Sequence, residues 1–484
     1  MKLRARRGKK VLIGLVIFLC VGTLSFFGIQ FFTKTGIFRI PGVVYYAEDL
    51  NEDEMETLSS IFTDEVDLDK DVYISVEESN NKRDLNEGEF LIEVSVPVAD
   101  FYDLREDTDE YEESEYTYIP IGELNFNKKL LSISGDYYLD SFDKGAVFRV
   151  LKFESEKYED EIAPLIGDTF KKEFPSKESV LTFAQTGVTA LSRGMNAKLY
   201  RVGDANYFAE GLKDYLSSFD LTHTSNESSF TDYATSGNIC SDKRFISTLL
   251  AVGLDIVELT GNHNVDCGAD AALETIDIYN ENNIKTVGGG KNADEAAIPL
   301  KINNKDTKIT FLAYNLSTGG ATYGARPGAN QYYEENATAE IAAAKERGDF
   351  VIVDIQYYEC SAYASTYEDP ICDYPQNVPG DEIGFFRHLI DLGADMVVGT
   401  SAHQPQTYEI YGNGVIYYGL GNLFFDQSWW PGTTRSLILS HYFYKDKLLQ
   451  TRVVPTVYDG NSQTKLLDKE TARWFLNRLV SIHP

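Results

Sequence analysis

Apolar and polar residues alternate along the chain in two ways, and the change falls near residue 180. Before it, short runs such as 71–76 and 90–96 have the alternation of β-strands and lie between acidic stretches. After it, apolar strands alternate with amphipathic helices, which is typical of an α/β domain. The predicted strands are 181–185, 254–259, 308–314, 350–355, 396–398 and 415–418, and the predicted helices include 207–217, 242–252, 270–282, 337–347 and 383–392.

The first 32 residues have a different pattern. Residues 11–32 contain no charged side chain, and as a helix they would measure about 33 Å, enough to cross a bilayer core. Lys and Arg fill six of the first ten positions, whereas acidic residues follow from Glu48, so the positive-inside rule places the bulk of the chain outside the cytoplasm. A cleaved signal peptide is the competing interpretation, but its apolar run is usually shorter. We therefore expect an uncleaved, single-pass anchor in the cell membrane.

These patterns divide the chain into five predicted parts. They are a cytoplasmic basic tail (1–10), a transmembrane anchor (11–32), an acidic accessory domain of α+β or β-rich type (34–178), an α/β domain (180–460), and a C-terminal helix and tail (461–484). Charge narrows the function further, because the net charge of −31 repels phosphate backbones and no basic patch follows the N-terminus. Nucleic acid is therefore not an expected partner.

Four cysteines follow the predicted anchor: Cys240, Cys267, Cys360 and Cys372. An oxidising exterior allows one or two disulfides in three full pairings, with Cys360 and Cys372 the closest pair in sequence. Buried free thiols are an equally weighted alternative. No C-x-x-C spacing indicates a zinc site.

Polar residues follow the predicted strands of the α/β part. Each alone is typical of a turn or a cap, but their recurrence favours one site, because strand-end loops carry the sites of α/β folds. In chain order they are Arg193, Asn226, Glu227, Asn262, His263, Asp266, Gln356, Glu359, His403, Asn422 and Asp426.

Four short motifs stand in a fixed order within residues 180–460: Asn226-Glu227; Gly261-Asn262-His263 with Asp266 and Gly268; Gly393-Ala394-Asp395 before a strand that leads to His403; and Gly419-Leu420-Gly421-Asn422 with Phe425 and Asp426. In this order they resemble the capsule-synthesis CapA family. The resemblance implies a metallophosphatase-like, layered α/β sandwich. It also implies a role in making or exporting poly-γ-glutamate capsule from the outer face of the membrane.

The chain departs from that family at three places. Where the family usually has Gly-Asp, residues 185–193 contain no acid, and Gln356 stands where a His is usual. The segment 400–403 keeps His403 but lacks the imidazole that usually precedes it. A two-metal phosphoesterase needs a bridging carboxylate and several His or Asp ligands, so this donor set predicts at most one divalent ion, Mn, Zn or Mg.

Three functions follow from this reading. The leading hypothesis is an anchored protein that handles an anionic cell-surface polymer beside membrane polymer-synthase subunits, with Asn226, Glu227, Gln356, Glu359 and Asn422 binding the substrate. The second is a metal-dependent hydrolase of the metallophosphatase type. Its metal ligands would be Asn262, His263, His403 and Glu227, and its catalytic residues would be His263, His403, Asp266 and Arg193, the last holding the anionic substrate. The third is a noncatalytic scaffold on the same fold.

Overall fold

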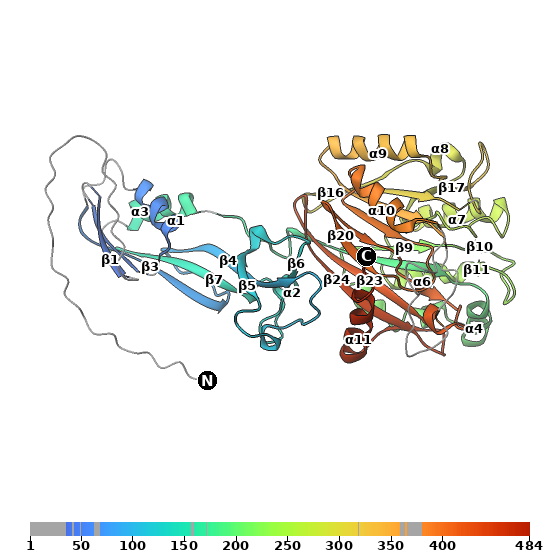
Figure 1. Ribbon diagram of the computed structural model, residues 1–484, viewed down its shortest axis with the longest axis horizontal. Helices are drawn as coiled ribbons and strands as arrows, with labels where there is room; N and C mark the ends of the chain where they lie inside the picture. Colours follow the sequence, from blue (N-terminus) through green and yellow to red (C-terminus); the bar gives the residue numbers. More distant parts are fainter. Residues whose placement is uncertain are drawn as a thin grey trace. The chain divides into compact units, whose positions relative to one another are not determined.

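The computed structural model describes residues 35–40, 43–48, 50–61, 68–155, 159–170, 172–317, 319–358, 364 and 380–484. The chain divides into two compact units, residues 1–76 with 152–169 and residues 77–151 with 170–484, and its elements are labelled in Figure 1. The predicted span 11–32 lies outside the described residues. Among the residues that are described, no helix combines the length and the apolarity needed to cross a membrane.

The first unit is built from strands and two helices. Strand β1 (Thr35–Ile40) pairs antiparallel with β2 (Val43–Glu48), and β2 pairs parallel with β3 (Leu68–Asn81), which contains the predicted strand 71–76. Helix α1 (Glu52–Ile61) follows Asn51, which forms a capping box with Glu54 through reciprocal hydrogen bonds of 2.8 Å. The second segment of this unit, residues 152–169, consists mainly of helix α3 (Glu159–Phe170).

Residues 77–151 pack as part of the second unit, although the sequence grouped them with the acidic accessory domain. Here β4 (Glu89–Asp100) pairs antiparallel with β5 (Thr117–Pro120) and β6 (Lys128–Leu130), next to helix α2 (Tyr138–Ser141) and strand β7 (Lys144–Glu154). Their apolar side chains share a core with Val180, Tyr442 and Leu449. The backbone N–H of Leu130 also donates to Gln450 Oε1 at 2.7 Å.

Two large sheets form the centre of the second unit. One has the strand order β13-β12-β9-β8-β23-β24-β25, with β22 also paired to β8, and the other has the order β15-β16-β18-β19-β21-β20. The strands of the first are β8 (Val180–Ala190), β9 (Leu221–Asn226), β12 (Ile256–Glu258), β13 (Lys285–Val287), β22 (Asn422–Phe425), β23 (Arg435–Tyr444), β24 (Lys447–Tyr458) and β25 (Thr464–Leu466). Those of the second are β15 (Leu300–Asn304), β16 (Thr307–Asn315), β18 (Phe350–Gln356), β19 (Met396–Gly399), β20 (Tyr408–Tyr411) and β21 (Gly414–Tyr417).

The helices and two short strand pairs surround these sheets. The helices are α4 (Gly194–Val202), α5 (Lys213–Leu216), α6 (Ile246–Ala251), α7 (Ala269–Glu281), α8 (Ala293–Ala296), α9 (Glu334–Glu346), α10 (Glu382–Asp391) and α11 (Lys469–Val480). The short pairs are β10 (Ser229–Thr231) with β11 (Cys240–Asp242), and β14 (Gly289–Gly290) with β17 (Gly328–Ala329).

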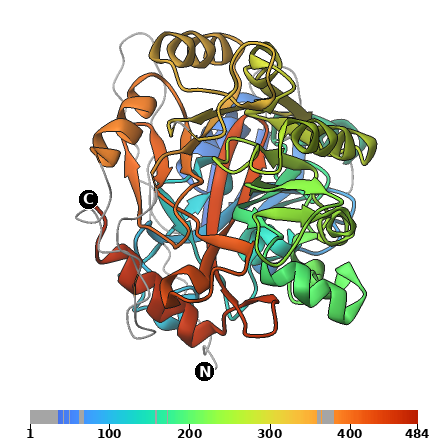
Figure 2. The same ribbon diagram turned by 90° about the vertical axis from the view of Figure 1, so that its right-hand side faces the viewer.

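Three apolar cores arrange these elements in layers. The first joins the two sheets, with Phe183 and Ile256 from one packed against Phe311 and Ile352 from the other. The second lies between the β8 sheet and helices α4, α6 and α7, and the third lies between the β18 sheet and helices α9 and α10. Figure 2 shows the sheets at the centre of this unit with helices outside them. The predicted layered α/β sandwich is thus confirmed as an architecture, and the apolar runs of its parallel strands reflect burial on both faces.

One predicted helix and the end of the α/β domain differ from expectation. The helix predicted over 207–217 is broken into a 3₁₀ turn (Ala205–Phe208) and α5. A Cβ at Gly211 would lie 2.2 Å from the carbonyl O of Thr464, so the chain needs glycine at this close approach. Strand β25 and helix α11, from the predicted tail 461–484, belong to the layered unit, because Phe475 and Leu479 lie in the core between the sheets.

Candidate functional site

The loops after the parallel strands meet at one edge of the two sheets. Strands β8, β9 and β12 run parallel to one another, as do β16, β18, β19 and β21, so each set presents its carboxyl ends together. Asn315, at the end of β16, links the edges by donating from Nδ2 to the carbonyl O of Thr260 at 2.6 Å. Gly261 lets the next turn approach β9, because a Cβ there would lie 2.8 Å from the Cα of Glu227.

Five of the predicted residues come together at this edge: Glu227, Asn262, Gln356, His403 and Asn422, which we call the strand-end cluster. Gln356 Nε2 donates to Glu227 Oε1 at 3.3 Å and to Asn262 Oδ1 at 3.2 Å, across the gap between the sheets. His403 Nδ1 lies 2.9 Å from Asn422 Oδ1, and its Nε2 lies 3.8 Å from Glu227 Oε2. Glu227, Gln356, His403 and Asn422 are all buried.

The hydrogen bonds of Asn422 show which nitrogen of the His403 ring acts as a donor. Because Asn422 Nδ2 donates to the carbonyl O of Thr433 at 3.1 Å, its Oδ1 faces His403 and accepts a hydrogen bond from Nδ1–H. The His403 Nε2 atom is therefore the ring nitrogen that faces the Glu227 carboxylate. The arrangement presents one carboxylate, one imidazole and three amides.

Other predicted residues lie apart from the strand-end cluster. The Nδ2 atom of Asn226 donates to the carbonyl O of Ser228 at 2.8 Å, so this side chain holds its own turn. His263 Nδ1 pairs with Asp266 Oδ2 at 2.6 Å, and both side chains are partly exposed. Glu359 lies outside the described residues, as do Cys360 and Cys372.

A disulfide fixes the turn that carries Asn262 and His263. It joins Cys240 in β11 to Cys267, 27 residues later, and so ties that turn to the short β10–β11 pair. The sequence left disulfides and buried free thiols open as alternatives, and Cys240 and Cys267 form a disulfide.

The double variant Cys240→Ala/Cys267→Ala is expected to lose about 3–4 kcal/mol of unfolding free energy. Without the crosslink, the unfolded chain gains the conformational entropy of the 27-residue loop, and this stabilises the unfolded state. Urea unfolding of the variant beside the wild type measures the loss. An unchanged midpoint would mean that the bridge does not constrain the unfolded chain.

Arg193 lies between β8 and α4, with backbone angles φ 50° and ψ −122°. A residue with a side chain rarely adopts this conformation, which costs roughly 1–3 kcal/mol and concentrates at functional sites. Its guanidinium carbon lies 5.0 Å from the ring centre of Phe425 and 5.4 Å from that of Trp429. The Nη1 atom is buried with no hydrogen-bond partner. Arg193 therefore offers donors that the described part of the protein does not use.

A second polar layer, which the sequence analysis missed, lies deeper between the sheets. Asp354 Oδ1 accepts from Gln185 Nε2 at 2.6 Å, and its Oδ2 lies 3.3 Å from His223 Nε2. Glu258 at the end of β12 is fully buried, and burial, with the nearby charge of Asp354, raises its pKa to about 7. Carboxylates inside otherwise apolar strands, as in 350–356, were the available signal.

The donor chemistry does not fit a two-metal centre. Among the described residues, no three His, Cys, Asp or Glu side chains come together as a metal-binding group. The amide nitrogen of Gln356 donates to oxygens of both Glu227 and Asn262, so a hydrogen-bond donor bridges these two side chains. Gln185 meets the Asp354 carboxylate in the same way. Amide N–H groups thus donate hydrogen bonds to the carboxylates of Glu227 and Asp354.

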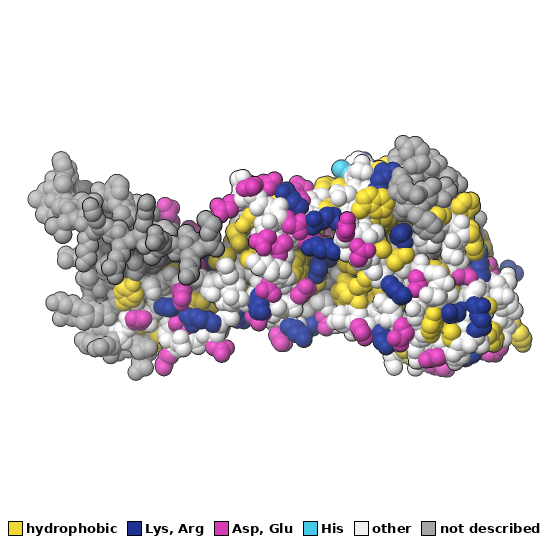
Figure 3. Space-filling view, turned by 90° about the horizontal axis from the view of Figure 1, so that it is seen from below, with side chains coloured by type: hydrophobic (Ala, Val, Ile, Leu, Met, Phe, Trp, Pro, Cys, Tyr) yellow, Lys and Arg dark blue, Asp and Glu magenta, His cyan; other side chains and the backbone are white. Residues whose placement is uncertain are grey.

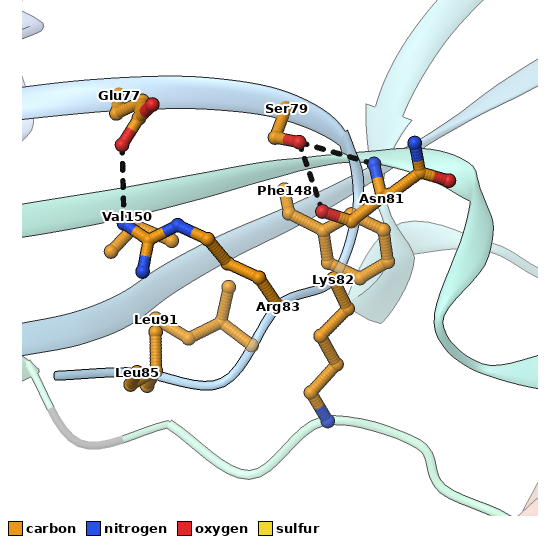
Figure 4. A pocket seen from close by; sticks show the side chains of 9 residues that line it. All are labelled: Glu77, Ser79, Asn81, Lys82, Arg83, Leu85, Leu91, Phe148 and Val150. Atoms are coloured by element: carbon orange, nitrogen blue, oxygen red, sulfur yellow. Dashed lines mark hydrogen bonds and ion pairs between the residues drawn. The ribbon is translucent and has the colours of Figure 1, made fainter.

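A small pocket lies on strands β3, β4 and β7, and none of the predicted site residues lines it (Figure 4). Its floor is apolar and includes Leu91 and Phe148. Arg83 spans its edge, with Nη1 at 2.6 Å from Glu89 Oε2 and Nη2 at 3.1 Å from Glu77 Oε2. This guanidinium already has two carboxylate partners, and Lys82 is the other basic side chain that lines the pocket.

Comparison with known families agrees with the position of the strand-end cluster. A model of the bacterial capsule synthesis protein family PGA_cap matches residues 182–427, about half of the chain, and this range contains every member of the cluster. The chain belongs to this family. The resemblance inferred from the four motifs is therefore confirmed.

Individual relatives of this PGA_cap protein are distant. The capsule biosynthesis protein CapA of Bacillus anthracis is 23% identical over 48% of this chain and 55% of its own length. The PGA biosynthesis protein CapA of Bacillus subtilis is 25% identical over 44% of this chain and 54% of its own length. A probable polyglutamine synthesis accessory protein of Mycobacterium tuberculosis is 27% identical over 37% of this chain and 47% of its own length. The chain thus spans about half the length of the curated relatives it matches.

Proposed function

We propose that this protein is a membrane-anchored, extracytoplasmic accessory protein in the synthesis or export of a capsular polymer of the poly-γ-glutamate type. One observation carries the proposal: the stretch that matches the capsule family folds so that its strand-end loops converge on one buried polar cluster. The names of the relatives support a polymer of this kind. The apolar run 11–32 with its basic flank supports the anchor.

The proposal assigns the layered unit to the polymer and to synthase subunits of the membrane as partners. The two-sheet sandwich with outer helices is compatible with a metallophosphatase-like fold, in which loops at the strand ends form the site. Binding rather than hydrolysis follows from the amide-rich donor set, because amides hydrogen-bond to carboxylates and peptide groups but do not activate water.

The charge of the protein constrains how a polyanion can bind. The face in Figure 3 carries Lys and Arg side chains interspersed with Asp and Glu rather than gathered in one large basic patch. With a net charge of −31, the chain repels a polyanion at long range. We therefore propose that binding depends on a local donor, Arg193, and strengthens as salt or divalent cations screen the repulsion.

Equilibrium binding of poly-γ-glutamate to the detergent-solubilised full chain tests this function. Titrations in low salt, in 150 mM salt and with Mg²⁺, Mn²⁺ or Zn²⁺ are expected to give saturable binding that is weakest in low salt. Absence of binding under every condition would remove the proposed function.

A metal-dependent hydrolase is the second candidate, and the 3.8 Å approach of His403 Nε2 to Glu227 Oε2 favours it. Together with Asn262, this pair would hold a single divalent ion, which would supply a Lewis acid at the strand-end cluster. Elemental analysis of the full chain beside the His263→Ala/His403→Ala variant tests it. Stoichiometric Mn, Zn or Mg that disappears in the variant would favour the hydrolase. Equal, substoichiometric metal in both proteins would exclude the hydrolase and leave polymer binding as the sole candidate function.

A further inference from the structure

Arg193 and Asp426 are held next to each other by paired strands. Arg193 follows β8 and Asp426 follows β22, and these strands run parallel with Ala190 opposite Phe425. Asp426 Oδ2 accepts from the backbone N–H of Gly194 at 2.5 Å, which fixes the carboxylate against the first turn of α4. The positive charge of Arg193 acts on this carboxyl, whose pKa burial raises above its ordinary value. The two groups therefore form one local unit of opposite charges.

Both charged groups have unused hydrogen-bonding capacity. Asp426 Oδ1 and Arg193 Nη1 are both buried, and neither has a hydrogen-bond partner among the described residues. No hydrogen bond joins the Arg193 guanidinium to any described residue. The side chains of Arg193 and Asp426 are partly exposed, so a ligand can reach them. A buried polar atom without a partner costs about 1–3 kcal/mol, which indicates that a ligand or water completes this pair.

The surroundings define the chemistry of such a ligand. Arg193 is the sole Lys or Arg in the loops 191–193, 227–239, 259–268, 400–407 and 426–434, which also contain Glu227, Asp266 and Asp426. A site with one guanidinium can hold one ligand carboxylate, whereas its own carboxylates repel a second. A cationic group on the ligand, by contrast, gains from Asp426. Trp429, with 58% of its surface exposed, supplies an apolar face beside the guanidinium.

The amino-terminal residue of a γ-glutamyl chain has this combination of groups. Its α-carbon carries both a carboxylate and an ammonium group, and two methylenes follow. An interior residue carries the carboxylate alone, because its nitrogen is in an amide bond. We propose that Arg193 and Asp426 bind the amino-terminal residue of a γ-glutamyl polymer, with the α-carboxylate on Arg193, the α-ammonium on Asp426 and the methylenes against Trp429. This inference rests on the proposed function and narrows it from the polymer to one end of the polymer.

Calorimetric titration of the full chain with three ligands tests the inference: a γ-glutamyl pentamer with a free amino end, the same pentamer N-acetylated, and free glutamate. Loss of a charge-assisted hydrogen bond weakens binding about tenfold or more, so the N-acetylated pentamer is expected to bind at least tenfold more weakly. Free glutamate is expected to bind more weakly than the free pentamer, because it lacks the rest of the chain. Equal binding of the free and acetylated pentamers, or glutamate as tight as the pentamer, would overturn the inference.

Three variants assign the effect to the two residues. Asp426→Asn retains an acceptor for Gly194 and is expected to bind both pentamers equally, whereas Arg193→Gln is expected to lose at least tenfold for each. Arg244→Gln is the matched control, because Arg244 also lies over an aromatic ring, Tyr200, but is already paired with Asp242. We expect wild-type binding in the control. A free-end preference retained in Asp426→Asn would overturn the role of Asp426.

The wild-type titration separates this inference from the proposed function. If long poly-γ-glutamate binds but amino-end acetylation has no effect, the inference fails and the function stands. If neither the polymer nor either pentamer binds, both fail. Should a variant not fold, as judged by its thermal unfolding midpoint, the comparison of the two pentamers on the wild type still decides.

Discussion

Replacing Glu258 by Gln is expected to stabilise the protein by about 3 kcal/mol at pH 8.5 and to leave its stability nearly unchanged at pH 4.5. Burial raises the pKa of this carboxyl from 4.5 to about 7 in the folded state. A raised folded-state pKa means that the native protein binds the proton more tightly than the unfolded chain does. The stability from this group is thus complete below pH 4.5 and is lost as the pH rises through about 7. Gln keeps the shape of protonated Glu without the ionisation.

Urea unfolding of wild type and Glu258→Gln from pH 4.5 to 8.5 measures the effect, and parallel curves would contradict it. Glu409→Gln is the matched control. Glu409 is also buried, but its carboxylate accepts from Arg387 at 2.8 and 2.7 Å and from Tyr418. Its replacement is expected to cost roughly 2–3 kcal/mol, the opposite sign, because it weakens a charge-assisted pair.

Replacing Gln356 by Glu is expected to destabilise the protein by about 3–5 kcal/mol at pH 8. The new carboxylate would stand where an amide nitrogen now donates to Glu227 Oε1 and Asn262 Oδ1, in a buried site. Two carboxylates in contact cannot both ionise there, so the pKa of the pair rises. The loss should shrink toward pH 5, where one of the two takes a proton.

Gln356→Met isolates the charge from the lost hydrogen bonds, because Met has a similar length and no charge. It is expected to cost about 1–3 kcal/mol with no added pH dependence. Thermal and urea unfolding of the two variants across pH 5–8 give the comparison. A Gln356→Glu protein as stable as the Met variant at pH 8 would mean that the gap between the sheets is open to water or cations.

Much of the layered unit could be predicted from the sequence, because parallel strands buried on both faces leave continuous apolar runs such as 350–355 and 396–398. The broken helix at 207–217 was missed, and the close approach of Thr464 to Gly211, which is far away in sequence, is not visible in the periodicity. The packing of residues 77–151 was also hidden by long-range contacts: their acidic loops dominate the composition, but their apolar side chains pack on β23 and β24.

The site was predictable as a set of strand ends but not as a network. Short motifs marked Glu227, His403 and Asn422 as strand-end residues, and the fold brings these three together, whereas His263 pairs with Asp266. The layer of His223 and Asp354 was missed because an ionisable residue inside an apolar strand marks a buried position but does not identify its partner. Its partners come from other strands, so tertiary pairing alone identifies it.

Hydrogen–deuterium exchange of the full chain with and without saturating poly-γ-glutamate shows whether the polymer binds at the strand-end cluster and the adjoining Arg193–Asp426 pair. We predict slowed exchange in residues 191–196, 226–231, 260–268, 401–407 and 421–434, with no change in 77–151. Slowed exchange confined to 77–151, or none in the strand-end loops of a protein that binds the polymer, would contradict the account.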